Sequence, residues 1–127
     1  MKFKLRAWDN DNECMCDVVA MDWVDGEIIT AHLEKSNGYC YKVYPEKDYG
    51  DSIHFMLYSD MVDEIKKINV CEFDIVTFTY DNILYSGIVK YVNNGFIIEY
   101  SSTLKHIPIN NVDNLLINGN LYEGDIK

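Results

Sequence analysis

Four cysteines and three histidines are the residues of this sequence best suited to hold a metal ion or act as nucleophiles. The cysteines stand at positions 14, 16, 40 and 71 and the histidines at 32, 54 and 106. A structural zinc site usually shows a C-x2-C knuckle with a second ligand pair, and the sequence has neither. Cys14 and Cys16 lie two residues apart, so on a strand they share one face. The positions of the cysteines, without a zinc-ligand pattern, predict four reduced, packed thiols, with no disulfide, no metal and no cofactor.

Two pairs of carboxylates are the other candidates for chemistry: Glu72 with Asp74, and Glu123 with Asp125. Such pairs can do acid–base work or hold a hard cation, but more often they form a solvated face or guard a strand edge. No serine or cysteine stands beside a histidine in a recognisable nucleophile motif. We therefore expect a protein without enzymatic activity, with an unrecognised enzyme as the alternative.

The segment Arg6-Ala7-Trp8-Asp9 combines residue types that dominate binding hot spots. Arg6 and Trp8 share a strand face, and Asp9 is placed to accept a hydrogen bond from the guanidinium. The pattern favours a structural clamp, in which the arginine stacks on the aromatic ring and is held by the carboxylate. The alternative is a contact site for a partner, formed by Arg6, Trp8 and Asp9.

Charge narrows the class of partner. The formal net charge is −10, and Arg6 is the single arginine. Phosphate binding and base reading rely on clusters of lysine and arginine, so direct nucleic-acid binding and docking to an anionic membrane are both disfavoured. A negative field attracts a basic protein surface, or mimics a nucleic acid, or only keeps the protein soluble.

The length of 127 residues suits one domain over residues 1–127, and 48% hydrophobic content favours a folded globule. No apolar run approaches the roughly 20 residues that span a bilayer. Asp9 and Asp11 interrupt the N-terminus before a signal-peptide core forms. These features predict a cytoplasmic protein with no membrane association.

Residues 1–58 have the pattern of an N-terminal β-hairpin annex. Asp25-Gly26 is a strong two-residue hairpin signal, which sets Val24 opposite Glu27 and Trp23 opposite Ile28. Breakers at 36–38 and 44–45 leave the structure of residues 34–52 open. Uninterrupted alternation would place one set of side chains on a common core face: Met15, Val19, Met21, Trp23, Ile28 and Thr30.

One short helix is expected over residues 59–69. Ser59 or Asp60 would cap its start, and Lys66-Lys67 near its end would suit the helix macrodipole. Apolar residues recur at spacings of four and three, as Met61, Ile65 and Ile68.

Residues 70–122 predict a small SH3-like barrel of four to six antiparallel strands, so the whole chain is a mainly β (β-rich α+β) fold. Asp81-Asn82 and Asn94-Gly95 mark two hairpins. In the second hairpin, Asn93 opposite Phe96 would set Lys90 directly opposite Glu99. A tight or 3₁₀ turn within residues 108–114 would precede the last strand.

Four stretches in order resemble the YopX family of phage and prophage proteins. Residues 4–9 (KLRAWD) resemble its opening "FRAWD", and residues 68–76 (INVCEFDIV) resemble its "IYEGDIV". Residues 87–91 and 96–100 are similar to its next hairpin, and residues 117–123 (INGNLYE) to its "VIGNIYE" ending. The resemblance implies an SH3-type barrel in the C-terminal half and a phage or prophage gene of a low-GC Gram-positive host. It implies no mechanism.

The sequence departs from the family pattern at Phe73, which replaces the glycine of "EGD". A phenylalanine is disfavoured at positive φ, so we expect ordinary β backbone there. Three functions remain open: a non-enzymatic module that binds or regulates a host or phage protein, an acidic nucleic-acid mimic or nucleic-acid-associated regulator, and an enzyme. Apolar and aromatic strands outside the clearest pairings also suggest a homo-oligomer.

Overall fold

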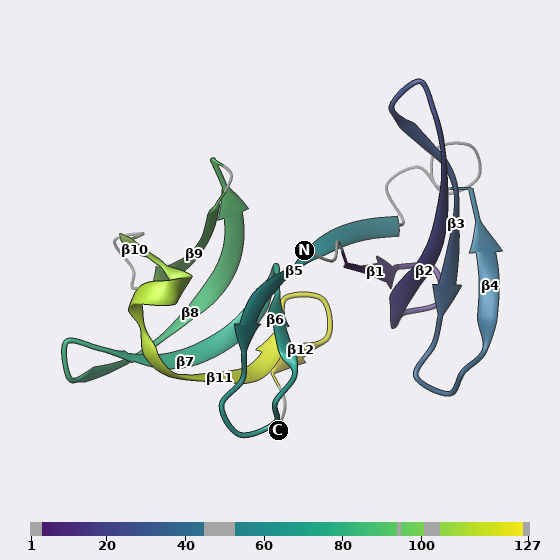
Figure 1. Cartoon of the computed structure of the whole chain (residues 1–127). Coiled ribbons are helices and arrows are strands. Elements are labelled where there is room, and N and C mark those ends of the chain that lie inside the picture. Colours follow the sequence, from purple (N-terminus) through teal and green to yellow (C-terminus); the bar gives the residue numbers. More distant parts are fainter. Residues whose placement is uncertain (1–3, 45–52, 94, 101–104, 126–127) are drawn as a thin grey trace. The chain divides into compact units, whose positions relative to one another are not determined.

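The computed structural model describes residues 4–44, 53–93, 95–100 and 105–125. The chain is mainly β, as the sequence predicts: antiparallel strands make up the described part, with one 3₁₀ turn, Ile109–Asn111. It divides into two compact units, Met1–Met56 and Leu57–Lys127. Figure 1 labels their strands. Each unit is described by itself.

Unit 1 is an antiparallel sheet built around one long hairpin. Strand β2 (Cys14–Val24) pairs with β3 (Glu27–Glu34), and Val24 lies opposite Glu27 and Trp23 opposite Ile28, which confirms the predicted Asp25-Gly26 turn. The sheet order is β4-β3-β2-β1-β5, where β1 is Leu5–Asp9, β4 is Cys40–Val43, and β5 (Ile53–Val62) continues into unit 2. The predicted breaker Pro45 and residues 46–52 lie outside the described residues.

Two register shifts change which side chains of the hairpin face the core. One lies between Val18 and Ala20 and the other between Asp22 and Trp23, which leaves Val19 and Ile29 without a directly opposed residue. A one-residue bulge moves the following side chains to the other face of a strand. On β2 the side chains that face the core are therefore Cys16 and Val18 before the bulge and Met21 after it. Trp23 lies on the same face as Met21 but beyond the core, where it is exposed. The predicted common face was wrong because alternation does not persist through a bulge; Val19, for example, is 53% exposed.

The core of unit 1 is small. Its buried members come from all five strands: Ala7, Cys16, Ala31, Leu33, Val43 and Ile53. Cys14, Val18 and Met21 pack against them as half-buried side chains. A core of this size ends well before the tip of the hairpin.

Unit 2 is a second antiparallel sheet, in the order β10-β9-β8-β7-β11-β12. The strands of this sheet are β7 (Asp74–Tyr80), β8 (Ile83–Val92), β9 (Gly95–Tyr100), β10 (Lys105–Pro108), β11 (Asp113–Asn120) and β12 (Gly124–Asp125). Unit 2 also contains β6 (Asn69–Cys71), which pairs with the end of β5 and so extends the first sheet. The predicted antiparallel strands and 3₁₀ turn are present. No pairing among the described strands closes a barrel, so an antiparallel sheet is the description that the pairings support.

Two hairpins of unit 2 test the predicted registers. Tyr80 lies opposite Ile83, and both intervening residues have positive φ, which confirms the two-residue turn at Asp81-Asn82. In the β8–β9 hairpin Val92 lies opposite Gly95, so Lys90 is opposite Ile97 rather than Glu99. The predicted register was wrong by two residues, a shift that preserves the faces. Lys90 Nζ still reaches Glu99 Oε1 diagonally at 3.1 Å. Asn94, expected in this turn, lies outside the described residues.

The helix predicted over residues 59–69 is wrong. Residues 59–62 belong to β5, residues 64–66 form a turn, and β6 begins at Asn69. The carboxylate of Asp63 accepts the backbone N–H groups of Ile65 and Lys66, and Lys67 takes a left-handed φ of 58° that ends the turn. Asp side chains compete in this way with helical hydrogen bonding. The apolar stripe therefore has no helix to follow, and Ile65 is 76% exposed.

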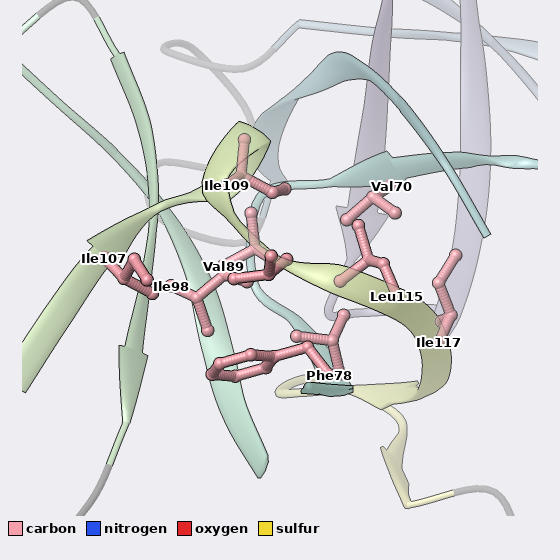
Figure 2. Close-up of a cluster of buried hydrophobic side chains, with 10 residues drawn as sticks. Val70, Phe78, Val89, Ile98, Ile107, Ile109, Leu115 and Ile117 are labelled. Carbon is pink, nitrogen blue, oxygen red and sulfur yellow. The ribbon is translucent and has the colours of Figure 1, made fainter. Parts of the chain in front are cut away.

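The core of unit 2 gathers apolar side chains from β6 to β11. Figure 2 shows Phe78, Val89 and Ile98 meeting beside the 3₁₀ turn, with Leu115 and Ile117 along β11. The rings of Tyr85 and Tyr100 contact Phe78 at centroid distances of 5.7 and 5.6 Å. These side chains, which come from strands far apart in the sequence, hold the strands of unit 2 together.

Phe73 keeps the positive φ that the family glycine would supply. Its φ is 65°, so the predicted β conformation was wrong. The backbone is held there from both sides: Phe73 N–H donates to the Val89 carbonyl at 2.7 Å, and the Phe73 carbonyl accepts from Leu121 N–H at 2.9 Å. The ring packs edge-on against Tyr122 at 6.0 Å. Tertiary bonds and packing offset the cost of this conformation.

Candidate functional site

The segment Arg6-Ala7-Trp8-Asp9 forms most of β1. Arg6 and Trp8 are 8% and 7% exposed, and Asp9 is fully buried. Successive side chains of a strand point to opposite faces, so Ala7 and Asp9 share the core face and Arg6 and Trp8 share the other. Trp8 Nε1 donates to Asn10 Oδ1 at 3.3 Å. Burial of all three predicted residues leaves little side chain for a partner to contact.

The carboxylate of Asp9 anchors a turn and a tyrosine. It accepts the Tyr41 hydroxyl at 2.6 Å, the Asn12 side-chain amide at 2.7 Å, and the backbone N–H groups of Asp11 and Asn12 at 3.1 and 3.2 Å. Burial alone would raise the pKa of Asp9, but these hydrogen bonds lower it below its usual value. These bonds hold Asp9 within unit 1, and the expected bond from Arg6 to this carboxylate stays a prediction. Asp9 therefore has a structural role.

The thiols of Cys14 and Cys16 share one face, as their spacing predicts. Their sulfur atoms are 3.6 Å apart, and the Tyr41 hydroxyl lies 3.6 Å from the first and 3.4 Å from the second. Burial raises the pKa of the Cys16 thiol to about 11. Burial and the bond to Asp9 also raise the pKa of Tyr41 far above its usual value. Protonated groups in contact suit packing better than nucleophilic catalysis.

Glu72, Asp74 and Cys71 also have structural partners. Glu72 Oε1 accepts Leu57 N–H at 2.8 Å, and buried Asp74 accepts Cys71 N–H at 2.8 Å. The four cysteines are free thiols, and Cys71 Sγ donates to the Leu57 carbonyl at 3.3 Å. Among the described residues, no three His, Cys, Asp or Glu side chains are grouped as metal ligands. The described part of the chain also contains no helix long and apolar enough to cross a bilayer.

The surface best suited to a function is one that sequence reasoning missed: the distal part of the β2–β3 hairpin. β1 pairs with β2 only at Cys14–Asp17, and β4 pairs with β3 only at Ala31–Glu34. Among the described residues, the segment 18–30 is therefore bordered only by the facing strand of its own hairpin: residues 18–21 pair with 31–33, and residues 22–30 pair with one another. We call it the hairpin arm. Figure 1 shows its tip extending past the end of β4.

Several large apolar side chains of the hairpin arm are exposed to solvent. Trp23 is 55% exposed and Val24 is 56% exposed, and both stand next to the turn. Val19 and Ile29 are also exposed, at the two positions where the register shifts. A two-stranded ribbon is marginally stable by itself, and clustered exposed apolar residues mark interaction sites. The sequence signal was present as the bulky residues around Asp25-Gly26, but alternation assigned Trp23 to the core.

Acidic side chains surround these apolar residues. Asp17, Asp22, Asp25 and Glu27 are all exposed on the same hairpin. The Thr30 hydroxyl donates to Asp22 Oδ2. The hairpin arm thus exposes Trp23 and Val24, on opposite faces of β2, among acidic side chains. We call Trp23 and Val24 its apolar centre, and Asp22, Asp25 and Glu27 its acidic rim.

A second exposed apolar group lies on the β7–β8 hairpin of unit 2. It contains Tyr80, Ile83 and Leu84, of which Leu84 is 72% exposed. It carries no tryptophan and its two strands are flanked by β9 and β11 along part of their length. This hairpin serves best as a matched comparison for the hairpin arm.

Comparisons with known proteins bear on the fold. No family model matches the chain, and no curated protein matches it. The strand pairings of the described residues define an antiparallel β protein with two sheets, β4-β3-β2-β1-β5-β6 and β10-β9-β8-β7-β11-β12. Among solved structures, the crystal structure of protein YopX from Bacillus subtilis is similar, with a TM-score of 0.66 and 14% identity over 98% of this chain and 96% of that chain. The chain therefore has a YopX-like fold, which confirms the resemblance read from the sequence at the level of fold.

Proposed function

We propose that this protein is a non-enzymatic binding module that engages a host or phage protein through the hairpin arm. The observation that carries the proposal is the exposure of Trp23 and Val24 at the tip of the hairpin, where residues 22–30 pair only with one another in the described chain. Tryptophan is among the residues that contribute most to interfaces. Covering this ribbon would bury apolar surface and add packing to an element that has little of its own.

The arrangement of acids favours this function over nucleic-acid mimicry. A mimic presents regular rows of acids in place of phosphates, whereas a binding module presents an apolar patch among them. On the hairpin arm, Trp23 and Val24 separate Asp22 from Asp25 before the turn, and the apolar pair Ile28-Ile29 follows Glu27 after it. An enzymatic role has less support, because the buried carboxylates Asp9 and Asp74 hold backbone and side-chain donors of their own fold.

Comparative affinity capture tests the proposal. Wild-type protein, Trp23→Ser and Leu84→Ser are immobilised, exposed to lysate of a low-GC Gram-positive bacterium, and the retained proteins are quantified by mass spectrometry. Leu84 is an exposed apolar residue on the other unit, at 72% against 55% for Trp23. We expect a protein that wild type and Leu84→Ser both retain and that Trp23→Ser loses at least tenfold. Equal retention by all three would refute the hairpin arm as the binding surface.

A further inference from the structure

The hairpin arm lies in the most acidic part of the chain. Residues 7–34 contain eight Asp or Glu and no Lys or Arg, in a chain whose formal net charge is −10. The acids nearest the exposed apolar residues are Asp22, Asp25 and Glu27, and all three are exposed. Each exposed charge interacts weakly through water, but three acids within six residues together bias which surface can approach.

A partner that covers Trp23 and Val24 must also cover or border these carboxylates. Desolvating a carboxylate without a cation is costly, whereas a cation at the rim restores the lost interactions and speeds association. Charge complementarity therefore selects the chemistry of the partner as much as the apolar centre does.

We infer, on the basis of the function proposed above, that the partner of the hairpin arm is a protein surface with apolar side chains flanked by lysine or arginine. A second copy of this chain fits less well, because a symmetric dimer through the hairpin arm would place two identical acidic rims against each other. A nucleic acid would be repelled by the same rim.

A short peptide of alternating valine and lysine is a direct probe. Matched peptides replace lysine by glutamate, or valine by glycine. Binding to uniformly ¹⁵N-labelled full-length protein is followed by amide shifts and by the Trp23 indole N–H signal, identified as the one missing in Trp23→Ser. We expect the valine–lysine peptide to shift signals of residues 18–30, and both control peptides to bind at least tenfold more weakly.

Neutralising the rim isolates the role of charge. The triple variant Asp22→Asn, Asp25→Asn, Glu27→Gln should weaken binding of the valine–lysine peptide about tenfold, because each exposed ion pair contributes a factor of roughly two. Raising NaCl from about 50 mM to about 500 mM should weaken wild-type binding to a similar degree, since the Debye length falls several-fold.

A control variant with the same change in net charge neutralises exposed acids of unit 2: Asp60→Asn, Glu64→Gln and Asp81→Asn. It should bind the peptide as wild type does, and an equal loss in both triple variants would reduce the effect to net charge. Circular dichroism verifies that each variant folds, and Val24→Ser replaces Trp23→Ser if the latter does not.

The outcomes separate this inference from the proposed function. If the capture experiment finds a partner that depends on Trp23 while the valine–lysine peptide causes no shifts in residues 18–30, the partner class is wrong and the docking surface stands. Equal binding of the glutamate peptide also overturns the inference. Sedimentation showing a dimer that Trp23→Ser dissolves would assign the hairpin arm to a second copy and overturn it as well.

Discussion

The buried carboxylate of Asp63 should be a main determinant of the stability of unit 2. It is fully buried and accepts three backbone N–H groups, from Ile65 at 2.8 Å, Lys66 at 2.7 Å and Ile117 at 2.7 Å. Burial alone would raise the pKa of Asp63, but these bonds and the charge of Lys66 lower it below its usual value. The informative perturbation is Asp63→Asn, which keeps the shape and removes the charge.

The expected cost follows from which bonds survive. An asparagine can keep its oxygen on the two N–H groups of the turn, where Ile65 and Lys66 are exposed. Its amide nitrogen then faces the buried N–H of Ile117, so two donors meet where a charged acceptor stood. A buried bond to a charged group contributes about 1.5–3 kcal/mol, so Asp63→Asn should destabilise unit 2 by about 2–3 kcal/mol at neutral pH.

The cost should depend on pH in one direction. A carboxyl whose pKa is lowered by folding contributes stability above its unfolded pKa of about 3.9, and that contribution is lost as the pH falls through the folded pKa. The difference between wild type and Asp63→Asn should therefore be full at pH 7 and shrink progressively below about pH 4. Asparagine does not titrate, so the variant itself supplies the reference.

The assay must report on unit 2 by itself. Both tryptophans, Trp8 and Trp23, belong to unit 1, so fluorescence follows the wrong part of the chain. Guanidinium unfolding followed by resolved NMR signals of β7 and β11 gives the free energy of unit 2. Glu64→Gln, an exposed neighbour, is the control and should lie within about 0.5 kcal/mol of wild type. A cost for Asp63→Asn below about 0.5 kcal/mol, or an undiminished cost near pH 3, would refute the reasoning.

Three further predictions concern single residues. Gly87→Ala should lower the stability of unit 2 by about 2 kcal/mol in the same unfolding assay, because its Cβ would lie 2.7 Å from a backbone oxygen of β9; Gly95→Ala, where the nearest such atom is at 3.9 Å, should be nearly neutral. Tyr41→Phe removes a donor from a buried carboxylate and should cost unit 1 about 1–2 kcal/mol, measured by tryptophan fluorescence during unfolding; an unchanged midpoint would contradict this. In pulsed alkylation at pH 8, exposed Cys40 should react well before Cys16, whose pKa of about 11 leaves about 0.1% thiolate, and mass spectrometry of the digested protein would reveal any reverse order.

Turn chemistry made parts of the fold predictable. Asp25-Gly26 and Asp81-Asn82 each fix a two-residue turn through residues that tolerate positive φ, and both pairings are found as expected. The interaction is local, so the residues that decide it are adjacent in the sequence. The shared face of Cys14 and Cys16 follows from the same kind of local geometry.

Competing interactions from distant residues explain the errors. The sequence around Asp63 has the apolar spacing of a helix, but the structure forms a turn there. The bond from Ile117 N–H, 54 positions away, to the Asp63 carboxylate helps to fix this turn. Phe73 holds a left-handed conformation because Val89 and Leu121 supply backbone bonds to it. A single window of sequence contains neither partner, so local propensity gives the wrong answer at both positions.

The candidate site also combines features that the sequence determines with features that only the tertiary structure determines. Sequence alone determined the residue types of the hairpin arm, its turn and its excess of acids, since composition and turn preference are properties of the chain itself. Only the tertiary structure decided that Val19 leaves the predicted face, because a bulge shifts it, and that Trp23 is exposed, because the neighbouring strands end before the tip of the hairpin. Exposure depends on what packs against a residue, and in a β-sheet those neighbours come from distant parts of the sequence.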